Sequence, residues 1–179
     1  MIEHSKSVRL GIKKSLMIVD MPYNTYRNKK QALRNCKKVI KETKCDGVKL
    51  EGGEKIKNIV NHLTSNKIPV MGHIGILPQL VRGKFKSKGK SEKEKKQLMK
   101  DAIFLEKAGC FAIVLECIEK NLSKKITKTI KIPTIGIGSS HHCDGQILVT
   151  DDLLSLTNSK IKFVKKYVDL KNSFNMSIF

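Results

Sequence analysis

The chain has 179 residues and a mass of 20.2 kDa, which suits a single domain, and we expect one domain over residues 1–179. Apolar residues make up 40% and charged residues 29%, and apolar runs recur along the whole length, which excludes a wholly disordered chain. No stretch approaches the roughly 18–20 apolar residues of a membrane-spanning helix. The first residues carry no apolar segment typical of a secretory signal, so we expect a cytoplasmic protein.

The charge is strongly positive, with 36 Lys and Arg against 16 Asp and Glu and a net charge of +20. Such an excess first suggests a polyanion as partner. However, nearly all of the positive residues are lysines, aromatic residues make up only 5%, and tryptophan is absent. Nucleic-acid readers depend on arginine forks and aromatic stacking. We therefore interpret the lysines as solvated helix faces, and the composition disfavours a nucleic-acid partner.

The five cysteines form no Cys-x-x-Cys pair, and their odd number favours reduced thiols over a disulfide framework. The cluster His141-His142-Cys143-Asp144 superficially resembles a metal site. Adjacent ligands seldom reach one ion without a distant second pair, and the sequence offers none. The pattern therefore disfavours a zinc site there.

Short apolar runs and stretches of helical periodicity alternate along the chain. In order, they predict strand 15–20, helix 28–44, strand 47–51, helix 56–63, strand 68–73, helix 91–109, strand 111–116, helix 122–130 and strand 132–137. Ser91 and Glu94 have the spacing of a capping box at the start of helix 91–109. Towards the C-terminus we expect a short helix over 145–149, a weak sixth strand over 153–156 and a helix over 161–170.

This alternation predicts an α/β fold with a parallel sheet covered by helices. Two arrangements fit, an open doubly wound sheet or a (β/α)₈ barrel. The open sheet is usually marked by a glycine-rich loop after its first strand. Here the first strand leads into Asp20-Met21-Pro22-Tyr23, and Gly136-Ile137-Gly138 after a later strand lacks the third glycine.

Polar side chains recur at the predicted C-terminal ends of four strands: Asp20, Lys49 with Glu51, His73 and Glu116. In parallel α/β folds, ligands bind at these ends. Lys49 and Glu51 are two residues apart and share one face of their strand. A single acid at such a position is usually a helix cap or part of a salt bridge, whereas the recurrence over four strands predicts a functional site.

Carboxylate oxygens suit a hard divalent cation such as Mg²⁺. A 2-oxo acid offers such an ion two oxygens, and chelation stabilises the enolate that forms when the adjacent carbon loses a proton. A nearby lysine would balance the substrate's charge, and a carboxylate not bound to metal could accept the proton.

Several blocks of the sequence resemble the ketopantoate hydroxymethyltransferase family in their order and spacing. The blocks are Asp20-Met21-Pro22-Tyr23, Val48-Lys49-Leu50-Glu51-Gly52-Gly53-Glu54, Pro69-Val70-Met71-Gly72-His73-Ile74-Gly75 with Pro78-Gln79, Val114-Leu115-Glu116-Cys117, Ile135-Gly136-Ile137-Gly138-Ser139 and Asp144-Gly145-Gln146-Ile147-Leu148-Val149. The likeness runs from about His4 to the tail.

The resemblance implies a (β/α)₈ TIM barrel of the phosphoenolpyruvate/pyruvate superfamily and a step of pantothenate biosynthesis. In that step, a hydroxymethyl group passes from 5,10-methylenetetrahydrofolate to 3-methyl-2-oxobutanoate and yields 2-dehydropantoate. By motif, Asp20 and Glu51 are metal ligands for Mg²⁺, Asp20 also contacts the substrate, Lys49 and His73 bind the substrate, and Glu116 is the catalytic proton acceptor. The family forms cytoplasmic homo-oligomers, often decamers.

The chain also departs from the family pattern. The family has two further strands before the Asp20 strand, and the second ends in an Asp-Ser pair that supplies another magnesium ligand. We count about six of the eight strands that a closed barrel needs, and so expect an incomplete barrel that is weakly active or inactive alone. In the family's Gly-Gly-Tyr-Lys-x-x-Gly-Arg loop, this chain has a different sequence from Gly83 to Lys90.

Two other functions stay open at this point. One is a different Mg²⁺-dependent lyase or mutase of the same superfamily that acts on a 2-oxo acid. The other, more distant, is a basic protein that binds nucleic acid, which would show steeply salt-dependent affinity.

Overall fold

A computed structural model describes residues 1–81, 86–157 and 161–176. Backbone proximity divides the chain into two units, Met1–Gly145 and Gln146–Phe179. The first contains the sheet and its covering helices, and the second contains two short helices. The prediction of one domain over 1–179 stays a prediction.

The sheet contains six strands among the described residues, in the spatial order β1-β2-β3-β4-β5-β6. They are β1 (Ile18–Asp20), β2 (Gly47–Glu51), β3 (Val70–Gly75), β4 (Ala112–Glu116), β5 (Thr134–Ile137) and β6 (Gly145–Gln146). The first five pair in parallel, each with its sequence neighbour. A doubly wound sheet would reverse its order at a switch point, and this one does not.

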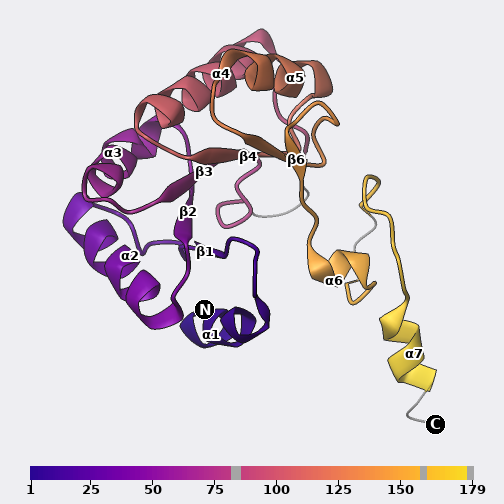
Figure 1. The fold of residues 1–179 in the computed structure, drawn as a ribbon. Coiled ribbons are helices and arrows are strands. Elements are labelled where there is room, and N and C mark those ends of the chain that lie inside the picture. The colour runs from indigo at the N-terminus through magenta and orange to yellow at the C-terminus, as the bar shows by residue number, and fades with distance from the viewer. Residues whose placement is uncertain (82–85, 158–160, 177–179) are drawn as a thin grey trace. The chain divides into compact units, whose positions relative to one another are not determined.

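Helices connect successive strands in the first unit and lie along the outside of the curled sheet (Figure 1). The connecting helices are α2 (Lys29–Thr43), the short 3₁₀ helix η1 (Glu54–Ile56), α3 (Lys57–Ser65), α4 (Glu92–Lys107) and α5 (Lys120–Thr129), whereas α1 (Ile2–Gly11) precedes β1. Sequential strand order with helices on a single face is the arrangement of a (β/α)₈ barrel. The predicted class, an α/β fold with an incomplete barrel, is therefore confirmed.

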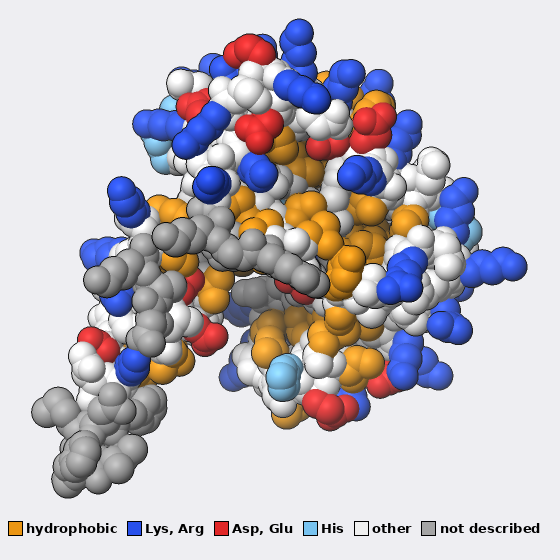
Figure 2. Space-filling model, turned by 180° about the vertical axis from the view of Figure 1, so that it is seen from behind, with side chains coloured by type: hydrophobic (Ala, Val, Ile, Leu, Met, Phe, Trp, Pro, Cys, Tyr) orange, Lys and Arg blue, Asp and Glu red, His pale blue; other side chains and the backbone are white. Residues whose placement is uncertain are grey.

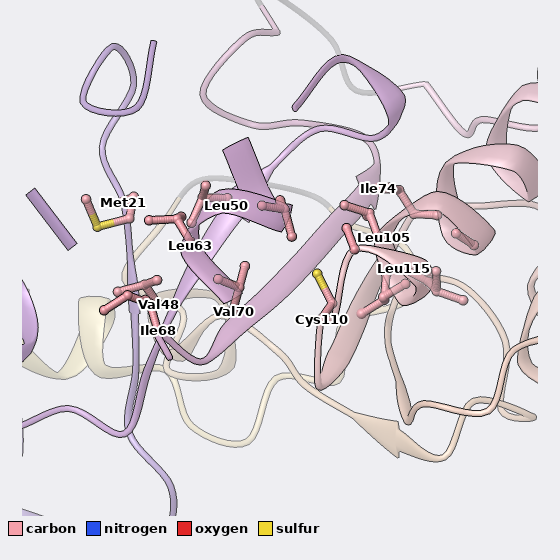
Figure 3. Close-up of a cluster of buried hydrophobic side chains, with 14 of the residues drawn as sticks. Met21, Val48, Leu50, Leu63, Ile68, Val70, Ile74, Leu105, Cys110 and Leu115 are labelled. Carbon is pink, nitrogen blue, oxygen red and sulfur yellow. The ribbon is translucent and has the colours of Figure 1, made fainter. Parts of the chain in front are cut away.

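The main hydrophobic core lies between the outer face of the sheet and the helices. Every second strand residue points into it, including Val48, Leu50, Val70, Ile74 and Leu115, all nearly inaccessible to solvent (Figure 3). The helices contribute residues spaced by three or four, such as Leu98, Ala102 and Leu105 of α4. The alternate strand residues, among them Met71, Ala112 and Val114, form a smaller apolar cluster on the inner face.

The helix boundaries follow local capping signals. Asn28 caps α2 by accepting a hydrogen bond from the backbone N–H of Gln31. The predicted capping box of α4 is confirmed in its first half, because Ser91 Oγ accepts from the Glu94 N–H. The Glu94 carboxylate accepts from the backbone N–H groups of Gly89 and Lys90, and so joins the preceding loop to this helix.

Three predictions near the C-terminus are wrong. Residues 145–149 begin with strand β6, because the Asp144 carboxylate accepts hydrogen bonds from the Thr134 N–H and Oγ1 and holds this segment beside β5. The weak strand at 153–156 is instead the end of helix α6 (Thr150–Leu153) and a turn with a positive φ at Ser155. Helix 161–170 is absent, and α7 (Leu170–Met176) begins where that helix was expected to end.

The second unit has its own backbone links. The N–H groups of Tyr167 and Leu170 donate to the carbonyls of Leu153 and Leu154, and Ser155 Oγ donates to the Val168 carbonyl. These bonds hold residues 167–169 in non-helical backbone beside the end of α6, which explains why apolar periodicity misled the prediction. Among the described residues, no helix combines the length and apolar character needed to cross a bilayer.

Lysine and arginine side chains are dispersed over the surface. Figure 2 shows them mainly around the margin of one face, with hydrophobic side chains gathered nearer its centre. Few of the described cations have acidic partners, and most of the described ion pairs lie on exposed surface, such as Lys6–Glu3 and Lys95–Glu92. Exposed pairs of this kind contribute little to stability, because water and salt screen their attraction.

Candidate functional site

The five predicted site residues all lie on the inner face of the sheet, at or near the C-terminal ends of neighbouring strands. Asp20 ends β1, Lys49 and Glu51 lie on β2, His73 lies on β3 and Glu116 ends β4. The period-two alternation of each strand directs these polar residues away from the helix-covered core. The same alternation buries their sequence neighbours under the helices, so packing fixes the direction of the polar side chains.

Asp20 and Lys49 form the first contact of the site. They are directly opposite each other in the parallel register of β1 and β2, and Lys49 Nζ lies 3.1 Å from Asp20 Oδ1. The Lys49 side chain is mostly buried, whereas that of Asp20 is half exposed. The pair therefore joins a mostly buried ammonium group to a carboxylate that solvent reaches.

His73 continues this contact chain across the sheet. Its Nδ1 lies 3.4 Å from Lys49 Nζ, and its Nε2 lies 3.1 Å from Glu116 Oε2. An ammonium group can only donate, so the contact with Lys49 assigns Nδ1 as acceptor and places the proton on Nε2, facing Glu116. Nε2 is fully buried and the contact with Glu116 lacks hydrogen-bond alignment, so this N–H has no hydrogen-bond partner among the described residues.

Glu51 is the most buried of the carboxylates, with 5% of its surface exposed. Burial raises the pKa of its carboxyl group, and the nearby His73 and the hydrogen bond from Gln79 oppose that rise. The Gln79 backbone N–H donates to Glu51 Oε2 at 3.2 Å. A buried carboxylate with so few donors is poorly compensated, and a cation beside it would supply what the protein does not.

The backbone around Glu116 is tightly held. The Ile76 N–H donates to the Glu116 carbonyl, and Gly75 has a φ of +103° with an added Cβ overlapping that carbonyl oxygen. Directly after Glu116, Cys117 has a φ of +50°, and its N–H donates to the Ile137 carbonyl. A glycine is therefore required at the end of β3 for β4 to present Glu116 at this point.

The loop that differs from the family pattern reaches this region as well. Its residues 83–85 lie outside the described part of the chain. The Lys88 N–H donates to the Cys117 carbonyl, and the Lys88 carbonyl accepts from the Glu119 N–H. Lys88, near the end of this loop, is thus fastened next to the residue that follows Glu116.

The structure brings Asp20, Lys49, His73 and Glu116 into one series of contacts and places Glu51 opposite His73 in the strand register. Their roles toward metal, substrate and proton stay predictions. No set of three or more His, Cys, Asp or Glu side chains within the described ranges is grouped to hold a metal ion.

The sequence assigned no role to Gln79, whose two hydrogen bonds join the site's segments. Its place in the Pro78-Gln79 block, outside any strand or helix, was the only signal. In the cluster from His141 to Asp144, which superficially resembles a metal site, the Asp144 carboxylate accepts hydrogen bonds from Thr134 and Cys143 is buried. The rings of His141 and His142 lie with their centroids 4.0 Å apart and their planes tilted by 40°. The contacts with Thr134 give Asp144 a structural role, and the expectation against zinc stays a prediction.

Known proteins match this chain over nearly its whole length. The family model described as ketopantoate hydroxymethyltransferase matches residues 1–178. Proteins named 3-methyl-2-oxobutanoate hydroxymethyltransferase are 61% identical in Pelagibacter ubique, 48% in Aliarcobacter butzleri and 46% in Agrobacterium fabrum, over 98%, 94% and 95% of this chain. The chain spans 68%, 64% and 62% of the lengths of these relatives. The chain therefore belongs to the ketopantoate hydroxymethyltransferase family.

Proposed function

We propose that this chain carries the enolate-forming site of a 3-methyl-2-oxobutanoate hydroxymethyltransferase, with 5,10-methylenetetrahydrofolate as the one-carbon donor and 2-dehydropantoate as product. The observation that carries the proposal is the contact series Asp20–Lys49–His73–Glu116 across four adjacent strands. It places a cation and a carboxylate of suitable chemistry on one concave face. The names of the relatives support 3-methyl-2-oxobutanoate as the acceptor, and the folate donor is part of the proposal.

Asp20 and Glu51 are the residues that would hold Mg²⁺. They fit a hard cation because both provide carboxylate oxygens, and burial leaves Glu51 with an elevated pKa that a cation would reverse. When bound, the ion would polarise the ketone of the 2-oxo acid and stabilise negative charge on its oxygen. Lys49 would neutralise the substrate carboxylate, because its ammonium group is already held at the site by Asp20 and His73.

Glu116 is proposed as the general base. It would accept the proton from C3 of 3-methyl-2-oxobutanoate, and the electrons of that C–H bond would pass into the C2–C3 bond as the enolate forms. The donor's methylene carbon then bonds to C3 as its two bonds to N5 and N10 of the folate break, and water supplies the hydroxyl group that it carries in the product. Tetrahydrofolate leaves, and its two nitrogens take up the proton removed from C3 and the remaining proton of water. The polar N–H of His73 Nε2, which lies 3.1 Å from Glu116 Oε2 without hydrogen-bond alignment, would stabilise the negative charge of that carboxylate electrostatically before the proton moves.

Other properties of the family extend the proposal. We propose that the protein acts in pantothenate biosynthesis in the cytoplasm and assembles as a homo-oligomer. We expect the isolated chain of 179 residues to have weak or no catalytic activity.

The test is exchange of the C3 proton of 3-methyl-2-oxobutanoate in D₂O, measured by NMR with and without Mg²⁺. It would be carried out on this chain and on a chimaera completed with the remaining segments of the Pelagibacter ubique relative. We expect Mg²⁺-dependent exchange that falls about 10²–10⁴-fold in Glu116→Gln. Glu42→Gln, an exposed carboxylate in an i,i+4 pair with Lys38, is the matched control.

Unchanged exchange in Glu116→Gln would refute Glu116 as the base. Full turnover by the 179-residue chain alone would contradict the expected weakness. If the completed chimaera converts a 2-oxo acid without any folate, a lyase or mutase of the same superfamily would be favoured instead.

A further inference from the structure

Gln79 makes two hydrogen bonds to different strand ends of the site. Its backbone N–H donates to Glu51 Oε2 and its side-chain Nε2 donates to the carbonyl oxygen of Met21, each at 3.2 Å. Met21 directly follows Asp20, so one residue links the segments that carry the two proposed metal ligands. Neither link follows from the sheet's own hydrogen bonds.

The local backbone makes both links available. The N–H groups of Leu80 and Val81 both donate to the Leu77 carbonyl, which forms a tight turn around Gln79. The Gln79 N–H precedes the first N–H that bonds to the Leu77 carbonyl, so the turn itself offers it no acceptor, as for the first N–H groups of a helix. It donates to the Glu51 carboxylate instead. The turn itself is anchored by Ile76, which is buried and donates to the Glu116 carbonyl.

The end of β1 needs such an anchor. This strand has three residues and pairs with β2, and after Asp20 the Met21 N–H donates to the Lys49 carbonyl at 3.0 Å. The Gln79 amide then fixes the other polar group of the Met21 backbone. With both groups held, the Asp20 backbone has little freedom to move away from β2.

We infer that Gln79 is a positioning residue that fastens the Asp20 end of β1 to the Glu51 carboxylate of β2, and thereby sets the spacing of the two carboxylates. The link to metal binding rests on the proposed function, whereas the link to the Met21 backbone does not. Residues that orient metal ligands in this way typically change metal affinity by about 10–100-fold when they are substituted.

The variants are Gln79→Met, which keeps the side-chain length without a donor, and Gln79→Glu, which places an acceptor against the Met21 carbonyl. Gln97→Met is the matched control, because Gln97 donates to Glu54 and Asp101 on the exposed surface of α4. The first readout is amide hydrogen exchange at Met21 in the metal-free chain. Exchange at buried Ile113 of β4 reports global stability.

The second readout is the affinity for Mn²⁺ alone, measured by electron paramagnetic resonance. We expect exchange at Met21 to accelerate about tenfold or more with Ile113 unchanged, and Mn²⁺ affinity to fall about tenfold or more in both Gln79 variants. Gln97→Met should change neither quantity.

Unchanged exchange at Met21 would overturn the inference. A lower melting temperature with unchanged Mn²⁺ affinity would also overturn it, because it would show a merely structural role. If the unsubstituted chain binds no Mn²⁺ while Met21 exchange still accelerates in the variants, the positioning role stands and the proposed metal site fails.

Discussion

His73 Nε2 approaches the Glu116 carboxylate to 3.1 Å although the two residues are not opposite each other in the sheet. The register pairs His73 with Val114 and pairs Glu116 with Gly75, so the contact is diagonal across the inner face. Diagonal neighbours lie about 7–8 Å apart at Cα, a distance that long side chains bridge. The imidazole therefore connects Lys49 on one side with the proposed base on the other.

Removing that connection should affect the proposed chemistry more than the fold. His73→Leu leaves the mostly buried Lys49 and Glu116 side chains without the group between them. We expect C3 proton exchange to fall by about 10–100-fold and the free energy of unfolding to fall by about 1–3 kcal/mol. Exchange NMR and urea titration would measure these, with exposed His141→Leu as control, and an unaltered exchange rate would argue against this role of His73.

A side chain at position 75 should disturb Glu116 directly. Gly75→Ala forces a residue with a Cβ into a φ of +103° and against the Glu116 carbonyl oxygen, at a cost of about 1–3 kcal/mol of stability and with displacement of β4. Gly11→Ala is the control, since a Cβ there has no neighbour within 4 Å and the helix should be maintained or slightly stabilised. Equal melting temperatures for the two variants would disprove the steric argument.

The buried Glu51 gives stability a defined pH dependence. Its pKa is raised in the folded chain, chiefly by burial, so the folded state retains this proton to higher pH than the unfolded state. Its contribution is most favourable below the unfolded-state pKa and is lost as pH rises through the folded-state pKa. Without metal, Glu51→Gln should therefore melt above the unsubstituted chain at neutral pH, and the gap should close in acid.

Differential scanning calorimetry between pH 4 and 8, with EDTA present, would measure this. Glu3→Gln is the control for the change in net charge. Glu3 is exposed and its described ion pair with Lys6 lies on the surface, so this substitution removes the same charge without changing a buried group. If the difference in melting temperature between Glu51→Gln and the unsubstituted chain grew toward low pH, the pKa of Glu51 would be lowered in the folded chain, contrary to the effect of burial.

The thiols of the folded chain should react slowly. Burial raises the pKa of Cys36 and of Cys110 to about 12 and that of Cys117 to about 11, so little thiolate exists at pH 8. We expect iodoacetamide to alkylate Cys117 before the two fully buried thiols, and all five cysteines within minutes once guanidinium unfolds the chain. Mass spectrometry of timed digests would identify the sites, and rapid native labelling of Cys36 would contradict its burial.

Much of the barrel architecture could be predicted because its signals are local. Gly47–Glu51 was predicted to the residue, and the helices α2 and α4 begin at capping residues that the sequence shows. Helix α1 was missed because only Ser5 of its ten residues is buried, so it has no apolar stripe to detect. The segment from 145 to 170 was misread because long-range bonds, such as Asp144 to Thr134, override its weak local preferences.

By itself, the sequence determined which residues face inward, because strict alternation buries Val48 and Leu50 and leaves Lys49 and Glu51 on the opposite face. Only the tertiary structure decided which of these residues meet. The strand register sets Asp20 beside Lys49, and the turn after β3 brings Gln79 to Glu51 across 28 positions of sequence. Side-chain direction follows from the chain's own period, whereas contact between strands depends on register and on loops that close through space.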